Sequence, residues 1–557
     1  MIRIVLLLCA VAGCTETIRI QADSLEGIVS LEVYPPDALV TVTDLSPPGQ
    51  TLQYTAMGHF NDGTTRDVTP LVGWSVDNVR IGAFDGNGQF TATQTAAGYG
   101  TVTIRAHGQE ASTTVTVMID ATIVDTAFPP PRASLFTTDP VAGGPLPTYP
   151  TSGTRFPQGL PNTLFQYGSS ASYDAYRLRF ESDVLHLRIE TGANRWRAEG
   201  AVQSILEGTG LAAPISFTVD ATSSSGTGVV YASAPITLEY SHDRPDTPLF
   251  YWSAATNGVM RANIMSPTAN KLYPSDGVCV GCHAISKDAG RMAMGYDNTT
   301  STDLEQIDLG SLSPTIPAST RKPMGWATYS PDSTRLLVAN NGVLELLATD
   351  SGAVLGTVPL PPMRFATHPD WSPDGSSIVV ALTSQTPNNL DVKAASIAKI
   401  PYNNGAWGPP QILVSGSASN NNYYPRWSPD GSHIAFVHAT SASEGAKSAE
   451  LLVMPAEGGS PLYLGRASHR VGGADVGDLA NIMPSWGPPQ PEHQWLAFVS
   501  SRAYGDVLAP NTRGQIWITS LDLDAPTDSS TPAFWLPCQD VTVLNNNPVW
   551  ANLVLTN

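Results

Sequence analysis

The chain has 557 residues and a formal net charge of −19, and only 14% of its residues are charged. This acidic balance argues against nucleic acid as a partner and against a basic surface for an anionic membrane, because both need clustered lysine and arginine. Few charges combined with 48 glycines and 46 prolines favour short strands and tight turns, so we expect an almost all-β protein.

The N-terminus has the parts of a bacterial export signal. Arg3 supplies a positive charge, residues 4–11 form a short apolar run, and small residues precede Cys14. The run is too short to span a bilayer. The segment resembles a lipobox, which implies a signal peptide at 1–13, lipidation of Cys14 and a tether at 14–24. The alternative is an ordinary signal peptide with an incidental cysteine.

These features predict a lipoprotein of the cell envelope. We expect it at the outer membrane, facing either the periplasm or the surface, with the lipid on Cys14 as its membrane contact. No other segment has 18 consecutive apolar residues.

Residues 25–120 alternate in the manner of strands, with Val102 and Ile104 separated by polar residues. Turn signals rich in Asn, Asp and Gly separate the expected strands. The segment resembles the bacterial immunoglobulin-like group 2 domain, and the matching stretches are 54–56, 60–64, 67–69, 73–75 and 100–106. The resemblance implies a β-sandwich that acts as a spacer or adhesive module, and it implies no catalysis.

The middle of the chain divides into a linker and a second alternating segment. Prolines at 129–131 and beyond predict a semi-rigid, extended linker over 121–154. Apolar residues then recur at every second position in 176–180, 185–189 and 215–219. This pattern predicts a second β-sandwich over 155–265, and no motif identifies its family.

The C-terminal half contains a repeated unit, a tight turn followed by a buried strand. The two clearest copies, 370–380 and 426–436, share the sequence Trp-Ser-Pro-Asp-Gly-Ser. They resemble the TolB-like, WD-type propeller repeat, which implies a β-propeller over 266–557. A less conserved copy of the unit contains Ser330. The equivalent serines Ser330, Ser372 and Ser428 are 42 and 56 residues apart, and each interval is long enough for a four-stranded blade. Six copies predict about six blades, with five and seven left open.

One copy of this repeat carries a chemical motif. Ser286 and Asp288 match the Ser and Asp of the turn, which places Cys279-Val280-Gly281-Cys282-His283 at the entry turn of the first blade. Cys-x-x-Cys-His is the attachment motif of c-type haem, in which the thiolates add to the vinyl groups and the histidine binds the iron. We therefore predict covalent haem c on Cys279 and Cys282, with His283 as the proximal ligand.

The sixth ligand of such a haem is not defined by the motif. The candidates are Met324, His368 and Met483, which precede other propeller turns. A sixth His or Met ligand would favour electron transfer, and an open position would permit chemistry on small ligands.

Other interpretations of the cysteines stay open. Cys279 and Cys282 could form a structural disulfide beside an incidental His283, or belong to a zinc site, although no second Cys/His pair lies nearby in sequence. A thioredoxin-like pair would need a βαβ context that is absent. Once the signal is removed and Cys14 is lipidated, Cys538 is the third remaining thiol, and three thiols cannot all pair within the chain. The role of Cys538 is undefined.

The chain lacks the common hydrolase motifs: it has no Gly-x-Ser-x-Gly, no phosphate-cradling loop and no His-Glu-x-x-His. We predict no catalytic residues. The sequence predicts a mono-haem propeller lipoprotein with a redox or electron-transfer role at the envelope, acting with an undefined redox partner or envelope protein. The alternative is a non-catalytic binding or scaffold propeller in which a Cys279–Cys282 disulfide cross-links the first blade.

Overall fold

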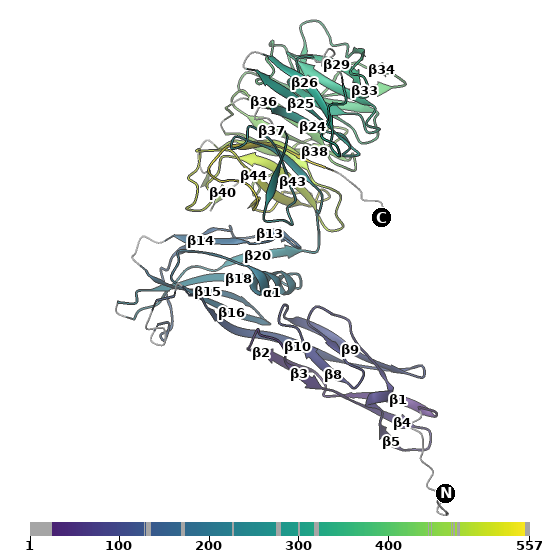
Figure 1. Ribbon diagram of the computed structural model, residues 1–557, viewed down its shortest axis with the longest axis vertical. Helices are drawn as coiled ribbons and strands as arrows, with labels where there is room; N and C mark the ends of the chain where they lie inside the picture. The colour runs from purple at the N-terminus through teal and green to yellow at the C-terminus, as the bar shows by residue number, and fades with distance from the viewer. Residues whose placement is uncertain are drawn as a thin grey trace, which may run out of the picture. The chain divides into compact units, whose positions relative to one another are not determined.

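The computed structural model describes residues 25–551 apart from the segments 127, 130–134, 169–172, 226–227, 274–279, 299–300, 317–321, 444, 447, 469, 472–473 and 476–478. The expected signal peptide, Cys14, the tether and Cys279 therefore lie outside the described residues. Within the described part the regular secondary structure is nearly all strand, which confirms the predicted all-β class (Figure 1). The chain divides into two compact units, 1–118 and 119–557.

The described residues of the first unit form nine strands, the first part of a tenth strand, β10, and a short 3-10 turn at Thr69–Leu71. The alternation predicted here is confirmed, since Val102 and Ile104 are fully buried while Thr101 and Arg105 are exposed. The strands pair as β1-β4-β5, as β3-β8-β7, and as β6-β9-β10 with β2 also on β10. The likeness to an immunoglobulin-like domain stays a prediction. The strands are β1 (Ile28–Tyr34), β2 (Ala38–Val42), β3 (Thr51–Gln53), β4 (Thr55–Phe60), β5 (Thr65–Asp67), β6 (Gly73–Val76), β7 (Gly82–Phe84), β8 (Gln89–Ala92), β9 (Gly98–Ala106) and β10 (Gln109–Val124).

The second unit opens with a sheet that runs β11-β19-β18-β15-β16 and continues onto residues 119–124 of β10. Strand β20 pairs with β18 and β13, and β12-β14-β17 form a separate small sheet. The predicted alternation is confirmed by the burial of apolar residues in β15, β16 and β18. The strands are β11 (Val141–Ala142), β12 (Leu146–Tyr149), β13 (Thr154–Pro157), β14 (Leu164–Gly168), β15 (Ala175–Ser182), β16 (Leu185–Thr191), β17 (Arg195–Arg197), β18 (Ile215–Thr222), β19 (Tyr231–Ala232) and β20 (Ile236–Ser241).

Two features of this region differ from the sequence prediction. Helix α1 (Gly200–Gly210) was not expected, yet it buries Val202, Ile205, Leu206 and Thr209, a helical spacing, and contacts β18 and β20. The pattern was missed because it lasts only three turns. Residues 121–154 are not simply a linker, because they contain β11 and β12.

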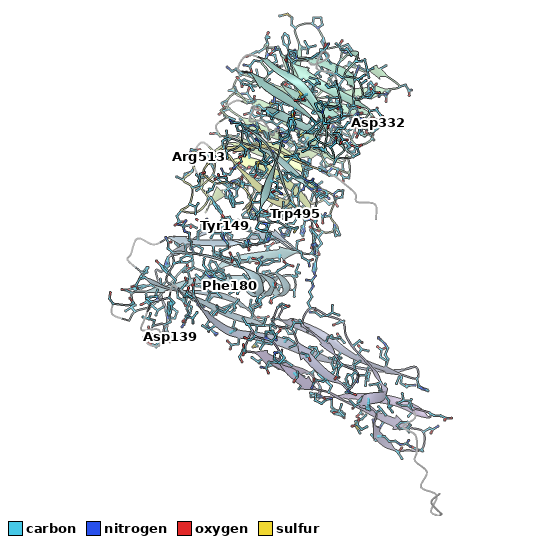
Figure 2. All side chains as sticks on the ribbon, in the orientation of Figure 1. Asp139, Tyr149, Phe180, Asp332, Trp495 and Arg513 are labelled. Atoms are coloured by element: carbon cyan, nitrogen blue, oxygen red, sulfur yellow. The ribbon has the colours of Figure 1, made fainter. Side chains whose placement is uncertain are left out.

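Tyr149, at the end of β12, shows why that segment is fixed. The residue is 5% exposed, and its ring meets Tyr504 edge-on at 4.8 Å and Trp517 at 6.2 Å between centroids (labelled in Figure 2). Its hydroxyl accepts a hydrogen bond from the Trp535 backbone N–H at 3.1 Å. A buried aromatic side chain thus ties the expected linker to the propeller.

The remainder of the second unit forms six propeller sheets among the described residues. In chain order these blades are β21-β22-β23 with β46, β24-β25-β26, β27 to β30, β31 to β35, β36 to β39, and β42 to β45 (coloured teal to yellow in Figure 1). The first strands β24, β27, β31, β36 and β42 contact one another in succession, and β46 contacts both β42 and β24. This closed ring of inner strands confirms the predicted propeller, with six blades.

The blade strands have the following bounds: β21 (Leu249–Ser253), β22 (Gly258–Ala262), β23 (Ala269–Tyr273), β24 (Val280–Ile285), β25 (Arg291–Asn298), β26 (Ser301–Asp308), β27 (Trp326–Tyr329), β28 (Arg335–Asn340), β29 (Val343–Ala348), β30 (Val354–Thr357), β31 (Phe365–Trp371), β32 (Ser377–Thr383), β33 (Ser396–Asn403), β34 (Ala406–Trp407), β35 (Gln411–Val414), β36 (Asn421–Trp427), β37 (His433–Ala439), β38 (Glu450–Pro455), β39 (Leu462–Tyr463), β42 (Asn481–Trp486), β43 (Gln494–Ser500), β44 (Gln515–Leu521), β45 (Phe534–Trp535) and β46 (Asn545–Trp550). A hairpin of β40 (Arg470–Val471) and β41 (Ala474–Asp475) lies between the last two blades in sequence.

The propeller begins earlier than the boundary expected at residue 266. Strands β21 and β22, expected in the second sandwich, pair with β46 at the end of the chain and complete a blade. Periodicity alone could not separate them, because the alternating pattern of a blade strand is the same as that of a sandwich strand.

The repeated turns share one hydrogen-bond pattern. In the intact copy, Ser372 Oγ donates to Asp374 Oδ1 at 2.6 Å and accepts from the Ser377 N–H at 3.1 Å. In the haem-motif copy, Ser286 Oγ donates to Asp288 Oδ1 at 2.6 Å and accepts from the Arg291 N–H at 2.8 Å. The predicted alignment of the two copies is therefore confirmed, and Asp332, labelled in Figure 2, belongs to a third such turn.

Candidate functional site

Cys282 and His283 lie within the inner strand β24, and not at the entry turn where they were expected. The turn begins only at Ser286, because each repeat unit starts with the last residues of an inner strand, as Trp371 shows at the end of β31. The pairing of β24 with β25 shifts register between Gly281 and Ala284, and Cys282 has a φ of 36°. The motif thus contains a β-bulge.

The same bulge recurs around the ring of inner strands. Register shifts occur at equivalent places in β31, β36 and β42, and β46 also shifts against β21. Each of these register shifts contains one residue with a positive φ, and the five residues come from five different blades. These residues are Cys282, His368 (φ 49°), Tyr424 (φ 54°), Met483 (φ 54°) and Asn547 (φ 50°).

We use the name axial cluster for Trp326, His368 and Tyr424, whose rings are in contact, together with Cys282 and Met483, which occupy the same bulge position in their own blades. The His368 ring lies 4.1 Å from that of Tyr424 and 4.7 Å from that of Trp326. Cys282 and Met483 pack against the apolar core that contains Trp326 and Tyr424. The fold therefore places one candidate sixth ligand, His368, against Trp326 and Tyr424, and a second, Met483, on the same extended apolar core as Cys282.

Met324, the third candidate, is placed differently. It is fully buried in a neighbouring apolar cluster with Ala284 and Leu304, on which Cys282 also packs. Its surroundings are those of an ordinary core residue.

The described cysteines are free thiols. Cys282 is partly buried, and burial raises the pKa of its thiol to about 12. Cys538 is also free, and burial raises the pKa of its thiol to about 12 as well. No disulfide therefore joins Cys282 to Cys538. At neutral pH Cys282 is a protonated thiol in this state of the protein.

His283 is 3% exposed. Its Nδ1 lies 3.2 Å from Asn547 Nδ2, while its Nε2 is buried and makes no hydrogen bond with any described residue. Burial lowers the pKa of this imidazole to about 3. A hydrogen-bonding interaction with the Phe250 backbone offsets part of that effect, and the charge of Arg426 lowers the pKa further. His283 is therefore a neutral imidazole with an unused ring nitrogen, which is the state in which histidine binds metals.

His368 is in a similar condition within the axial cluster. It is 3% exposed, and its Nδ1 is buried without a hydrogen-bond partner among the described residues. Burial lowers its pKa well below the ordinary value, and the charge of Arg426 adds to this. Trp326 Nε1, beside it, is also buried and unpartnered. Buried polar atoms without partners are uncommon in folded proteins, so their gathering here marks a candidate site.

A cavity that is partly open to solvent lies beside His283 and is called the axial cavity below. His283, Asp370 and Arg426 line it, with Trp427 and Trp486. Arg426 Nη1 lies 3.5 Å from Asp370 Oδ1. The cavity therefore combines an ion pair with an imidazole that has one ring nitrogen without a partner among the described residues.

Asp370 and Arg426 are not among the site residues predicted from the sequence. Both occupy the position just before the Trp of the repeat, where the six inner strands carry different residues. These are Ala284, Thr328, Asp370, Arg426, Ser485 and Val549, and all of them line the axial cavity. The variation at this one position, within a unit that is otherwise repeated, is the sequence signal that could have identified these two residues as lining a site.

A second cluster of titratable groups, Asp243, Glu492 and His493, lies where β20 ends beside the last blade. The Asp243 carboxylate is fully buried and accepts hydrogen bonds at 3.0 Å from the backbone N–H groups of Glu492 and His493, from His493 Nδ1 and from Trp495 Nε1. Trp495 is labelled in Figure 2. Since four donors already occupy the carboxylate, the cluster is a structural clamp.

No family model matches the chain, and no curated protein matches it. The chain is similar in structure to TolB from Acinetobacter baumannii, with 16% identity over 60% of this chain and 79% of that one, at a TM-score of 0.38. Putative TolB from Agrobacterium tumefaciens matches with 16% identity over 52% and 88%, at 0.32. The Swd1 β-propeller domain from Myceliophteria thermophila matches with 10% identity over 50% and 91%, at 0.33. At these scores the fold rests on the sheet topology, and no activity is transferred.

Among the described residues, no helix has the length and apolar character needed to cross a membrane.

Proposed function

We propose that this protein is an exported lipoprotein whose propeller carries one c-type haem and serves in electron transfer at the cell envelope. Cys279 and Cys282 would hold the haem through thioether bonds, and His283 would bind the iron. The observation that carries the proposal is the neutral, buried His283, whose Nε2 has no partner among the described residues, directly beside the free thiol of Cys282.

The described residues fit this group by their donor chemistry. A metal-bound histidine typically donates from its other ring nitrogen to a fixed acceptor. Asn547 lies 3.2 Å from His283 Nδ1. With its amide turned to present Oδ1, Asn547 would give up its hydrogen bond to the His283 carbonyl, accept the Nδ1 proton and leave Nε2 free for iron. The haem would supply one-electron transfer, and the protein would supply the ligands.

His368 is our preferred sixth ligand, and Met483 is the second choice. Both lie at the same bulge position as Cys282 in their own blades, and His368 has the unpartnered Nδ1. Replacing the sixth ligand should convert a low-spin haem spectrum to a high-spin one, so His368→Ala and Met483→Ala identify it separately.

Anchoring at the envelope would depend on the lipid at Cys14. The redox partner would be another envelope protein, and the acidic net charge of −19 favours a partner with a cationic docking face. Cys14→Ser should release the protein from the membrane fraction while leaving the haem in place.

Haem attachment is tested on the full chain expressed in a periplasm that has the c-type maturation system. We expect a pyridine haemochrome spectrum and a mass increase of one haem, both lost in the double variant Cys279→Ser/Cys282→Ser. Cys538→Ser is the matched control and should keep the haem, because Cys538 is a free thiol outside the motif. A wild-type protein with no covalent haem and a Cys279–Cys282 disulfide would overturn the proposal in favour of a scaffold propeller.

A further inference from the structure

We infer that Arg426, held by Asp370, is the charged group that sets the reduction potential of the haem at the propeller axis. The inference rests on the proposed function and extends it to residues outside the Cys-x-x-Cys-His motif. It begins from the position of one cation with respect to His283, whose Nε2 has no hydrogen-bond partner among the described residues.

Arg426 and the proposed iron ligand face the same space. Arg426 lines the axial cavity together with His283, although it belongs to β36 and His283 to β24. A guanidinium that shares a cavity with the iron ligand disfavours an additional positive charge there.

The ion pair holds this charge in place. Asp370 Oδ1 lies 3.5 Å from Arg426 Nη1, and Asp370 Oδ2 accepts a hydrogen bond from the Trp427 N–H at 2.8 Å. Thr328 Oγ1 donates to Asp370 Oδ1 at 3.3 Å. The backbone of Arg426 is fixed as well, because its carbonyl accepts from Trp486 Nε1 at 3.1 Å. The Arg426 side chain is 21% exposed and that of Asp370 is 9% exposed, so water screens the pair weakly.

A fixed charge changes the balance between the two oxidation states of the iron. The ferric state carries one more positive charge than the ferrous state, so a nearby cation raises the reduction potential and a nearby anion lowers it. Arg426 and Asp370 therefore act in opposite directions. Loss of Arg426 leaves the buried carboxylate uncompensated, and loss of the Asp370 charge leaves the guanidinium uncompensated.

The experiment is a spectroscopic redox titration of the haem-loaded full chain with small-molecule mediators. We expect Arg426→Gln to lower the midpoint potential and Asp370→Asn to raise it. Each change should shift the reduced-to-oxidised ratio at a fixed potential about tenfold, which is about 59 mV for a one-electron couple. Arg426→Lys keeps the charge and should remain near wild type. Arg364→Gln removes an exposed arginine, causes the same change in net charge, and should leave the potential unchanged.

The outcomes are separable. Haem-loaded variants of Arg426 and Asp370 with the wild-type potential, or with shifts in the same direction, overturn this inference and leave the haem proposal standing. A wild-type chain that never acquires covalent haem overturns both. If Arg426→Gln does not fold, Asp370→Asn decides the question by the sign of its shift.

Discussion

Asn547 Nδ2 lies 3.2 Å from His283 Nδ1 and 3.4 Å from the His283 carbonyl oxygen, across 264 residues of sequence. Asn547 belongs to β46, the strand that closes the propeller, and His283 belongs to the inner strand that carries the haem motif. Closure of the propeller and orientation of the proposed iron ligand therefore depend on the same contact.

The first prediction concerns this contact. Asn547→Leu removes both interactions and leaves the buried His283 Nδ1 and carbonyl oxygen without this partner, so the free energy of unfolding should fall by about 1–3 kcal/mol. Urea denaturation of the chain without haem measures it. Asn546→Leu, at a partly exposed position on the same strand, is the control. Equal losses for the two variants would contradict a specific role for Asn547.

The second prediction concerns the reactivity of Cys282 in the chain without haem. A pKa of about 12 against an ordinary value of 9.0 lowers the thiolate fraction roughly a thousandfold. Iodoacetamide should therefore leave Cys282 unmodified in the native state at pH 8 and modify it rapidly in urea. Peptide mapping by mass spectrometry follows each cysteine, and the Cys279→Ser background removes exchange with the neighbouring thiol. Rapid native labelling of Cys282 would show that the axial cluster is open.

The third prediction concerns acid stability through the Asp243 clamp. Burial alone would raise the pKa of Asp243, but hydrogen bonds from His493, the Glu492 backbone, Ser241 and Trp495 outweigh it and hold the pKa below 3.8. The folded state then binds fewer protons than the unfolded state, so this stabilisation is present above a pH of about 4 and is lost as the pH falls further.

Asp243→Asn tests the clamp by removing that titration. The variant should lose about 2 kcal/mol of unfolding free energy at pH 7, because an amide cannot accept from all four donors. Its stability should also decline less steeply than that of wild type between pH 5 and pH 3. Parallel pH profiles for the two proteins would show that Asp243 does not titrate in this way.

The fourth prediction uses the repeated turn. Ser286→Ala and Ser372→Ala each remove a hydroxyl that donates to an aspartate and accepts from a backbone N–H. Each should cost about 1–2 kcal/mol in unfolding free energy, and the two costs should be similar. Thermal unfolding compares them. A negligible cost for Ser286→Ala alone would mean that the blade with the haem motif does not share the turn of the others.

The sequence alone predicted much of the local structure. The hydrogen bonds of the Ser-Pro-Asp-Gly turn join residues within about five positions of one another. Each copy can therefore be recognised from its own short sequence, including the copy at Ser286. Alternation in β9 and β15 gave the buried faces for the same reason, because strand burial has a period of two.

Only the tertiary structure decided how distant segments meet. The pairing of β21 with β46 moved the start of the propeller, and the ring of bulges brought Cys282, His368 and Met483 around one axis. Asp370 and Arg426 became an ion pair because neighbouring blades place the same repeat position side by side. Local patterns record turns and burial, whereas closure of a ring is set by pairings hundreds of residues apart, which periodicity does not encode.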